Sequence, residues 1–468
     1  MILPLALSSD EERVQHVRHW LLFAVSALGI AGAFALLAVL TRTPAIQLLQ
    51  SAEGLHRAIA GHVTFALLVW LLAFEAVLWI LAAAPARHAT LPSWGLGLAS
   101  LGSAFLIVAV LSGRGVAVLT DYVSVVVDPL FFAGLAIVAF GVGLVAWNAV
   151  ARVSGKSSLL QHSMRSAAVV GALALGACGA TLLRLGAASP LPGDFAFFQS
   201  LFWMTGHLLQ FVNVVAMVSA WYLLLDLGFG IEVPDGRLPR LAFTGYVALA
   251  CLLLAWTLPL DPRSLPANLQ LSVLMGISAA LPTLVHAGIV TRAIARRPRG
   301  CSSPEGAALV CSLTLFICGI ALALARARTG SSMWIPAHYH AVVVGGVTMA
   351  FMGLTHGLLV RTGKIAWPRL ATLQPWLYGV GMLLVVVGMN WAGAEGAPRK
   401  TFDPDLGAAA ARWVTPMNVM GLGGVIAVLG GAIFVVNALW SLLTAADREE
   451  ATATLVAVNT EFLHSRTR

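Results

Sequence analysis

The sequence predicts an all-α, polytopic membrane protein, and two observations support this fold class. Hydrophobic residues make up 59% of the 468 residues and charged residues only 10%, and the mean hydropathy is +0.88. The apolar residues are gathered in stretches long enough to cross a bilayer, which takes about 20 residues of helix. Backbone groups in lipid must be hydrogen-bonded within their own segment, so each stretch is predicted to be a helix.

We count twelve such stretches and expect twelve transmembrane helices. They run over residues 20–40, 57–84, 93–113, 129–150, 164–187, 197–227, 241–260, 270–294, 306–326, 334–361, 371–393 and 417–444. The predicted organisation is a cytoplasmic segment (residues 1–19), one membrane domain (residues 20–444) and a cytoplasmic C-terminal tail (residues 445–468).

Basic residues predict the orientation, because short loops rich in Lys and Arg stay in the cytoplasm. With both termini inside, the predicted inner ends hold many of them, including Arg165, Arg237, Arg240, Arg292 and Arg296, while the outer loops hold fewer. We therefore interpret the net charge of +8 as a topology signal and not as a nucleic-acid surface. The expected location is the cell inner (plasma) membrane.

The five cysteines form no CxxC or CxxCH pattern. This argues against a covalently attached heme or a thiolate metal cluster.

Four histidines are the strongest indication of function. His62, His207, His338 and His340 all lie near the start of even-numbered helices, so they are expected at one depth near the outer side. His338 and His340 are two residues apart and project about 200° apart on a helix, so each can face a different cofactor. Ionisable side chains in a membrane usually mark a functional site, and imidazole suits iron and copper. The alternative for any one of them is a buried histidine bonded to a carbonyl group.

An adjacent basic pair, Arg399 and Lys400, lies in the outer loop after the eleventh helix, on the same side as the four histidines. Heme carries two propionates, and outward-pointing propionates would meet this pair. Taken alone, the pair would be read as ordinary solvated charges.

Over nearly its whole length the chain resembles subunit I of the heme-copper terminal oxidases (the cytochrome c and quinol oxidases). Five separated motifs carry the resemblance through their order, helix numbers and sidedness. They are Ala60-Gly61-His62, Phe202-Trp203-Met204-Thr205-Gly206-His207, Leu281-Pro282-Thr283, Ala337-His338-Tyr339-His340 and Gly396-Ala397-Pro398-Arg399-Lys400.

The resemblance implies two hemes of unknown type. His62 and His340 would be the axial ligands of a low-spin heme, His338 would hold the iron of a high-spin heme, and Arg399 and Lys400 would meet the propionates. His207 matches the first of three histidines that bind copper in active members.

The sequence departs from the family at the reaction centre. It has no His-His dipeptide; the positions of that pair fall near Trp256 and Thr257, and Phe211 stands where many members have a tyrosine. One imidazole does not replace three copper ligands, so we expect copper to be absent, and the catalytic residues stay unassigned. His286 and Glu75 are the candidate proton-path residues; the alternative for His286 is a core polar residue bonded to a helix carbonyl.

The resemblance, together with these departures, implies a heme-binding protein that acts in respiratory electron transport and for which four-electron reduction of oxygen is doubtful. The expected partners are other subunits of a respiratory complex and a cytochrome c or quinol donor. Two alternatives stay open. One is an active oxidase with an atypical, copper-free site, and the other is a gas-binding heme sensor or assembly protein.

Overall fold

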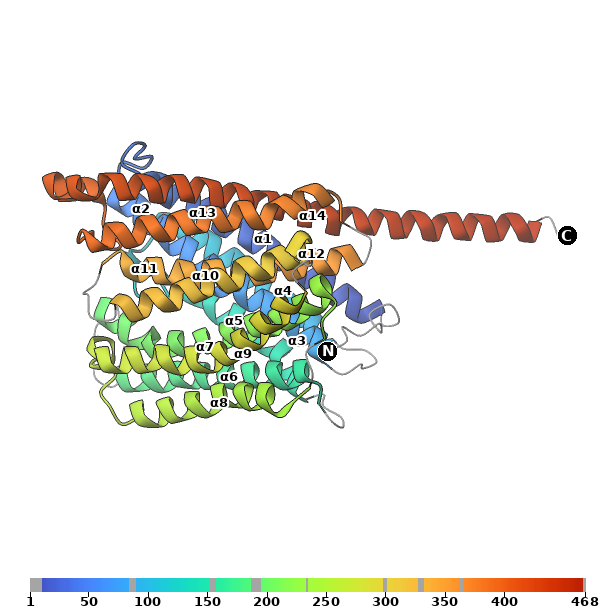
Figure 1. Ribbon diagram of the computed structural model, residues 1–468, viewed down its shortest axis with the longest axis horizontal. Helices are drawn as coiled ribbons and strands as arrows, with labels where there is room; N and C mark the ends of the chain where they lie inside the picture. The colour runs from blue at the N-terminus through green and yellow to red at the C-terminus, as the bar shows by residue number, and fades with distance from the viewer. Residues whose placement is uncertain are drawn as a thin grey trace.

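The computed structural model of the chain describes residues 11–83, 90–151, 157–186, 195–232, 235–297, 301–326, 332–361 and 365–465. The predicted terminal segments therefore lie partly outside the described residues. Within the described residues, twelve helices are long and apolar enough to cross a membrane, which confirms the predicted number. They pack into one bundle, and the last helix continues beyond it (Figure 1).

The elements have the following bounds. They are α1 (Glu11–Thr41), α2 (Ala52–Val63), η2 (Thr64–Trp70), α3 (Leu71–Ala82), α4 (Leu91–Leu111), β1 (Ala117–Val118), β2 (Val125–Val126), α5 (Pro129–Ala151), α6 (Leu159–Gly186), α7 (Phe195–Phe229), α8 (Arg237–Thr257), η3 (Leu265–Ala267), α9 (Leu269–Arg296), α10 (Pro304–Arg326), α11 (Trp334–Tyr339), η5 (His340–Val347), α12 (Thr348–Arg361), α13 (Pro368–Ala394), η6 (Asp403–Trp413) and α14 (Val414–Ser465).

Three spans form the centre of the bundle. In the span Ala52–Ala82 (α2, η2 and α3) and in α7, 89% of the most apolar stretch is buried, and in Trp334–Val360 (α11, η5 and most of α12) the share is 94%. The other spans reach only 28–50%, so they form the outer ring that faces lipid. The three central spans are the ones that carry the four histidines.

Two of the central spans contain a π-helical segment beside a histidine. Segment η2 begins two residues after His62, and η5 begins at His340 itself. A π-helical segment shifts the register of the side chains, and such segments are frequent at functional sites. No local sequence pattern predicted either of them.

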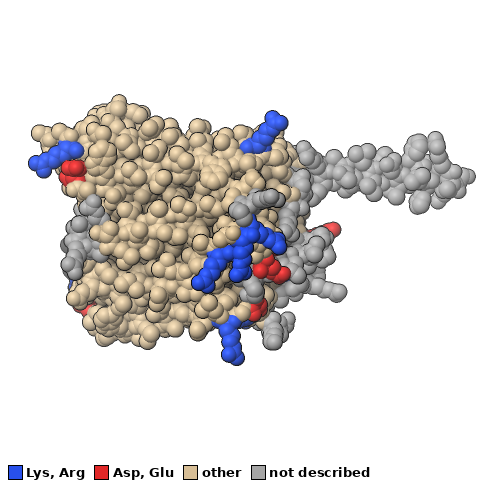
Figure 2. Space-filling view, in the orientation of Figure 1, with Lys and Arg blue, Asp and Glu red and all other residues tan. Residues whose placement is uncertain are grey.

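The face of the bundle seen in Figure 2 is almost free of charge between its two ends. Figure 2 shows Lys, Arg, Asp and Glu gathered toward the two ends of the visible face, with uncharged residues between them. Helices α13 and α14 pack closely along this apolar zone because glycine permits it: a Cβ atom on Gly388 would lie 2.4 Å from the backbone nitrogen of Met420. Small residues at helix contacts are typical of membrane bundles.

A small antiparallel β-hairpin connects α4 to α5. Ala117 pairs with Val126, and Val118 pairs with Val125. We call residues 117–126 the β-hairpin, and its tip, residues 119–124, reaches the four-histidine end of the bundle, where Tyr122 contacts His207.

Candidate functional site

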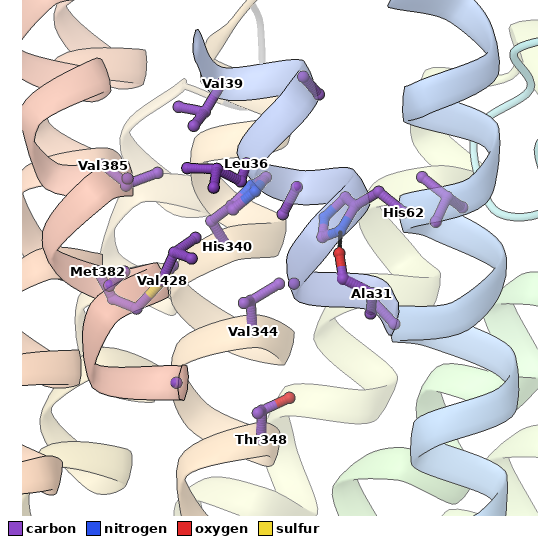
Figure 3. A pocket seen from close by; sticks show the side chains of 18 of the residues that line it. Ala31, Leu36, Val39, His62, His340, Val344, Thr348, Met382, Val385 and Val428 are labelled. Atoms are coloured by element: carbon purple, nitrogen blue, oxygen red, sulfur yellow. Dashed lines mark hydrogen bonds between the residues drawn. The ribbon is translucent and has the colours of Figure 1, made fainter. Parts of the chain in front are cut away.

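His62 on α2 and His340 at the start of η5 face one another across a cavity (Figure 3). Their ring centroids are 6.4 Å apart, and the ring planes differ by 21°. Metal–imidazole bonds are about 2 Å long and the nitrogen lies about 1 Å from the ring centroid, so one metal shared by two imidazoles separates their centroids by about 6 Å. The spacing of the two rings therefore leaves room for one iron atom between them.

Both imidazoles are oriented by backbone carbonyl groups. Nδ1 of His62 lies 3.2 Å from the carbonyl oxygen of Ala31, and Nδ1 of His340 lies 2.7 Å from that of Pro336. A carbonyl oxygen only accepts, so Nδ1 carries the proton and Nε2 keeps its lone pair. This is the arrangement of most metal-binding histidines, in which the second nitrogen is held by a carbonyl or carboxylate.

The cavity between the two rings has a volume of about 440 Å³ and is lined mainly by apolar residues of α1, α13 and α14. Its size lies within the range of cofactor sites, about 300–1,000 Å³. Gly61, the neighbour of His62, lies against Phe34 of α1; a Cβ atom there would come 2.9 Å from the phenyl ring. Glycine thus lets α1 close one wall of the cavity.

One rim of the cavity is polar and charged. Arg399 forms an ion pair with Asp121 at 2.7 Å, and Lys400 donates to the carbonyl oxygens of Leu119 and Thr120 at 3.0 and 2.5 Å. Both basic residues also line the cavity. Lys400 adopts a left-handed backbone conformation (φ 62°), which costs a non-glycine residue about 1 kcal/mol and marks a position fixed by its surroundings.

The charges at this rim perturb one another. Burial alone would raise the pKa of Asp121, but Arg399, Lys400 and a hydrogen bond from Gln199 hold that pKa below its ordinary value. Burial lowers the pKa of Lys400 to about 8, although Asp121 acts in the opposite direction. The rim therefore keeps Asp121 ionised close to two basic groups.

A second ion pair lines the same rim. The guanidinium of Arg42, directly after α1, lies 2.7 Å from Asp403 and 3.1 Å from the sulfur of Met333. Nε of Arg42 is buried and has no hydrogen-bond partner among the described residues.

The cavity as a whole is suited to heme. It combines an apolar lining, two imidazoles that face one another and a cationic rim. Heme iron takes axial histidines, and the heme propionates are anionic.

His338 points away from this cavity, as its separation from His340 predicted. Its Nδ1 lies 2.9 Å from the carbonyl oxygen of Gly319 on α10, so His338 and His340 face different neighbours of one helix. Gly319 allows α10 to pack closely against the helix that carries His338, because a Cβ atom there would lie 2.5 Å from the side chain of Val342.

His207, which the resemblance links to copper, has a hydrogen-bond partner within the protein at each ring nitrogen. Nδ1 of His207 lies 2.8 Å from the carbonyl oxygen of Trp203, and its Nε2 lies 2.9 Å from the hydroxyl of Tyr122.

The two positions where the family has its His-His pair offer no copper ligand. Trp256 is 53% exposed, and the hydroxyl of Thr257 donates to the carbonyl of Leu253. In the described part of the chain, no cluster of three or more His, Cys, Asp or Glu side chains could hold a metal ion. These residues do not fit a copper site.

The two proton-path candidates are fully buried and do not line the cavity. Nδ1 of His286 on α9 lies 2.6 Å from the hydroxyl of Tyr222, while its Nε2 is buried and has no hydrogen-bond partner among the described residues. The same is true of both carboxyl oxygens of Glu75 on α3. The structure brings neither of them to the cavity.

Sequence reasoning missed Asp121 and Tyr122. Both belong to the β-hairpin and contact residues more than 75 positions away. The only available signal was the presence of an acid next to a tyrosine in the loop between the third and fourth apolar stretches.

A membrane bundle whose central helices present paired imidazoles to an apolar cavity with a cationic rim is typical of proteins that hold heme inside the bilayer. The chain belongs to the cytochrome c and quinol oxidase polypeptide I family, whose model matches residues 15–427.

Individual proteins agree with this assignment. The chain is 27% identical to an uncharacterized protein of Aquifex aeolicus over 74% of this chain and 86% of that protein. It is 26% identical to cytochrome c oxidase subunit 1 of Thermus thermophilus over 54% of this chain and 49% of that subunit. The fold is similar to a chain of a heme-copper terminal oxidase dimer solved by cryo-electron microscopy (TM-score 0.76, 17% identity, 91% of this chain and 84% of that chain). The predicted fold class and family are therefore confirmed.

Proposed function

We propose that this protein is a heme-binding, subunit I-like component of respiratory electron transport that holds a low-spin heme between His62 and His340. The observation that carries the proposal is the separation of the two rings, 6.4 Å between centroids, across an apolar cavity. A heme bound there would accept and pass on one electron at a time.

The residues of the chain would act on that heme in three ways. His62 and His340 would orient it, because their rings are fixed by the carbonyl groups of Ala31 and Pro336. Apolar residues of α1, α13 and α14 would exclude water from its faces. Arg399 and Lys400, already at the cavity rim, would neutralise its propionates.

The visible absorption spectrum of purified protein tests this proposal. His62→Ala should abolish the low-spin heme bands, because the iron loses one of its two axial ligands. His162→Ala is the matched control, since His162 is bonded to the carbonyl of Arg240, outside the cavity, and its removal should leave the bands unchanged. Unchanged bands in folded His62→Ala protein would refute the proposal.

We also propose a second, high-spin heme at His338, whose Nδ1 is held by Gly319 and whose Nε2 is left for a metal. A heme with an open position binds carbon monoxide, so the reduced protein should show a spectral shift with this gas. The shift should disappear in His338→Ala while the low-spin bands persist. Absence of a shift in the wild-type protein would contradict a second heme and favour a simple electron carrier.

The degenerate copper position argues against rapid four-electron oxygen reduction by this chain, so we propose electron transfer as its function within a larger assembly. Partners would be other respiratory subunits and a cytochrome c or quinol donor.

We propose the cell inner membrane as the location, with both terminal segments (residues 1–19 and 445–468) on the cytoplasmic side and the heme ligands toward the outside. The exposed arginines at the end of α9, Arg292 and Arg296, support this orientation. His286 and Glu75 stay proton-path candidates.

A further inference from the structure

The tip of the β-hairpin contacts several of the residues that the family resemblance singled out. The backbone nitrogen of Asp121 donates to Gln199 on α7 at 3.0 Å, and the side-chain amide of Gln199 donates to the carboxylate of Asp121 at 2.5 Å. Arg399 and Lys400 bind the same tip from the loop after α13. The hairpin therefore ties α7 to the basic rim of the cavity.

Tyr122, the next residue of the tip, uses the nitrogen of His207 that a metal would need. A neutral imidazole has one donor and one acceptor nitrogen. The carbonyl oxygen of Trp203 accepts from Nδ1, so the lone pair is on Nε2, and the hydroxyl of Tyr122 donates to it over 2.9 Å. No lone pair of His207 is left for a metal ion.

The position of Tyr122 is built into the packing of α7. Its ring centroid lies 4.7 Å from that of His207, and the ring lies over Gly206 so closely that a Cβ atom there would come 2.1 Å from Cγ of the tyrosine. Tyr122 is 9% exposed, and its ring also lies near that of Tyr339, the residue between His338 and His340, with 6.0 Å between the ring centroids. Only glycine at position 206 leaves room for this ring.

We propose that Tyr122 takes the place of a metal ion on His207, and that His207 holds the β-hairpin against α7 instead of binding copper. His207 is then a positioning residue: it fixes Tyr122 and, through the hairpin tip, the Asp121 carboxylate that pairs with Arg399 and Lys400. This inference does not require a heme at either proposed position.

A double-mutant experiment with hydrogen–deuterium exchange tests the inference on the full-length purified protein. Tyr122→Phe keeps the ring over Gly206 and removes only the hydroxyl, and His207→Ala removes the acceptor. Each should speed amide exchange in residues 113–128 about five-fold, the effect of losing one hydrogen bond. The double variant should be no faster than either single variant, because both changes remove the same bond.

Three further measurements complete the test. His207→Gln should restore part of the protection, because its amide oxygen can accept from Tyr122, and this variant also serves if His207→Ala does not fold. Tyr246→Phe is the matched control, since it removes a buried hydroxyl bonded to Thr283 and should leave residues 113–128 unchanged. Copper per chain, measured after incubation with one equivalent of copper, should be far below one and equal in wild-type and His207 variants.

Two results would overturn the inference. One is close to one copper per wild-type chain that is lost in the His207 variants. The other is unchanged exchange of residues 113–128 in Tyr122→Phe. Either result can occur whether or not the low-spin heme bands are present, so this test is separate from that of the proposed function.

Discussion

His62 and His207 occupy comparable places in the bundle and have different surroundings. Each follows a glycine within a buried central span, and each has Nδ1 bound to a backbone carbonyl oxygen. Nε2 of His62 is on the side of a cavity shared with His340, whereas Nε2 of His207 accepts from Tyr122. The residue type is the same, and the two sites differ in the partner of the second nitrogen, which on our proposals determines whether a metal can bind.

The two glycines show how each arrangement is built. Gly61 admits Phe34, an apolar side chain through which α1 packs against α2, and Gly206 admits Tyr122, a polar side chain that reaches the histidine itself. A glycine before a histidine thus permits close approach in both cases, and the approaching residue determines the chemistry.

The largest expected effect separates the two regions directly. His340→Ala should abolish the low-spin heme bands, while His207→Ala should retain them in full, since His207 does not line the cavity. The measurement is the reduced-minus-oxidised spectrum at equal protein concentration. Equal loss in both variants would mean that His207 supports the heme after all.

A smaller effect is expected from substituting the two glycines. Gly206→Ala should lower the free energy of unfolding by about 2 kcal/mol, because the new methyl group meets the tyrosine ring, which cannot move without leaving His207. Gly61→Ala should be close to neutral, since a contact at 2.9 Å needs a smaller shift and alanine favours a helix by about 1 kcal/mol. Thermal unfolding in detergent measures both, and the reverse order would contradict the description of the two contacts.

The smallest effect is a pH dependence at the hairpin. The pKa of Asp121 lies below its unfolded value of 3.8, so the carboxylate contributes stability that is fully present above that value and is lost as the pH falls through the folded-state pKa. The thermal midpoint of the wild type should therefore exceed that of Asp121→Asn at pH 6, and the difference should shrink as the pH falls below 3.8. A constant difference would exclude this origin.

Composition was enough to predict the helices. Long apolar stretches with charges between them predicted twelve spans, and the structure has twelve among its described residues. The spacing of His338 and His340 also predicted that they face different neighbours, which the contacts with Gly319 and with the cavity of His62 confirm. These features depend on helix geometry and hydrophobicity, which are local properties.

The remaining features depend on contacts between distant segments. The β-hairpin has only two residue pairs, too few for a pattern in the sequence, and Tyr122 meets His207 across 85 positions. The π-helical segments next to His62 and His340 lie in two of the most buried spans, and no apolar periodicity in the sequence indicates them. The missing His-His dipeptide led us to expect no copper, but it did not predict that the hydroxyl of Tyr122 would contact Nε2 of His207.

Electron paramagnetic resonance of the oxidised, purified protein tests the central claim most directly, because it detects low-spin ferric heme and cupric copper in one spectrum. The account predicts the signal of a heme with two imidazole ligands and no cupric signal above trace level. A stoichiometric cupric signal, or the lack of a bis-imidazole heme signal, would contradict it.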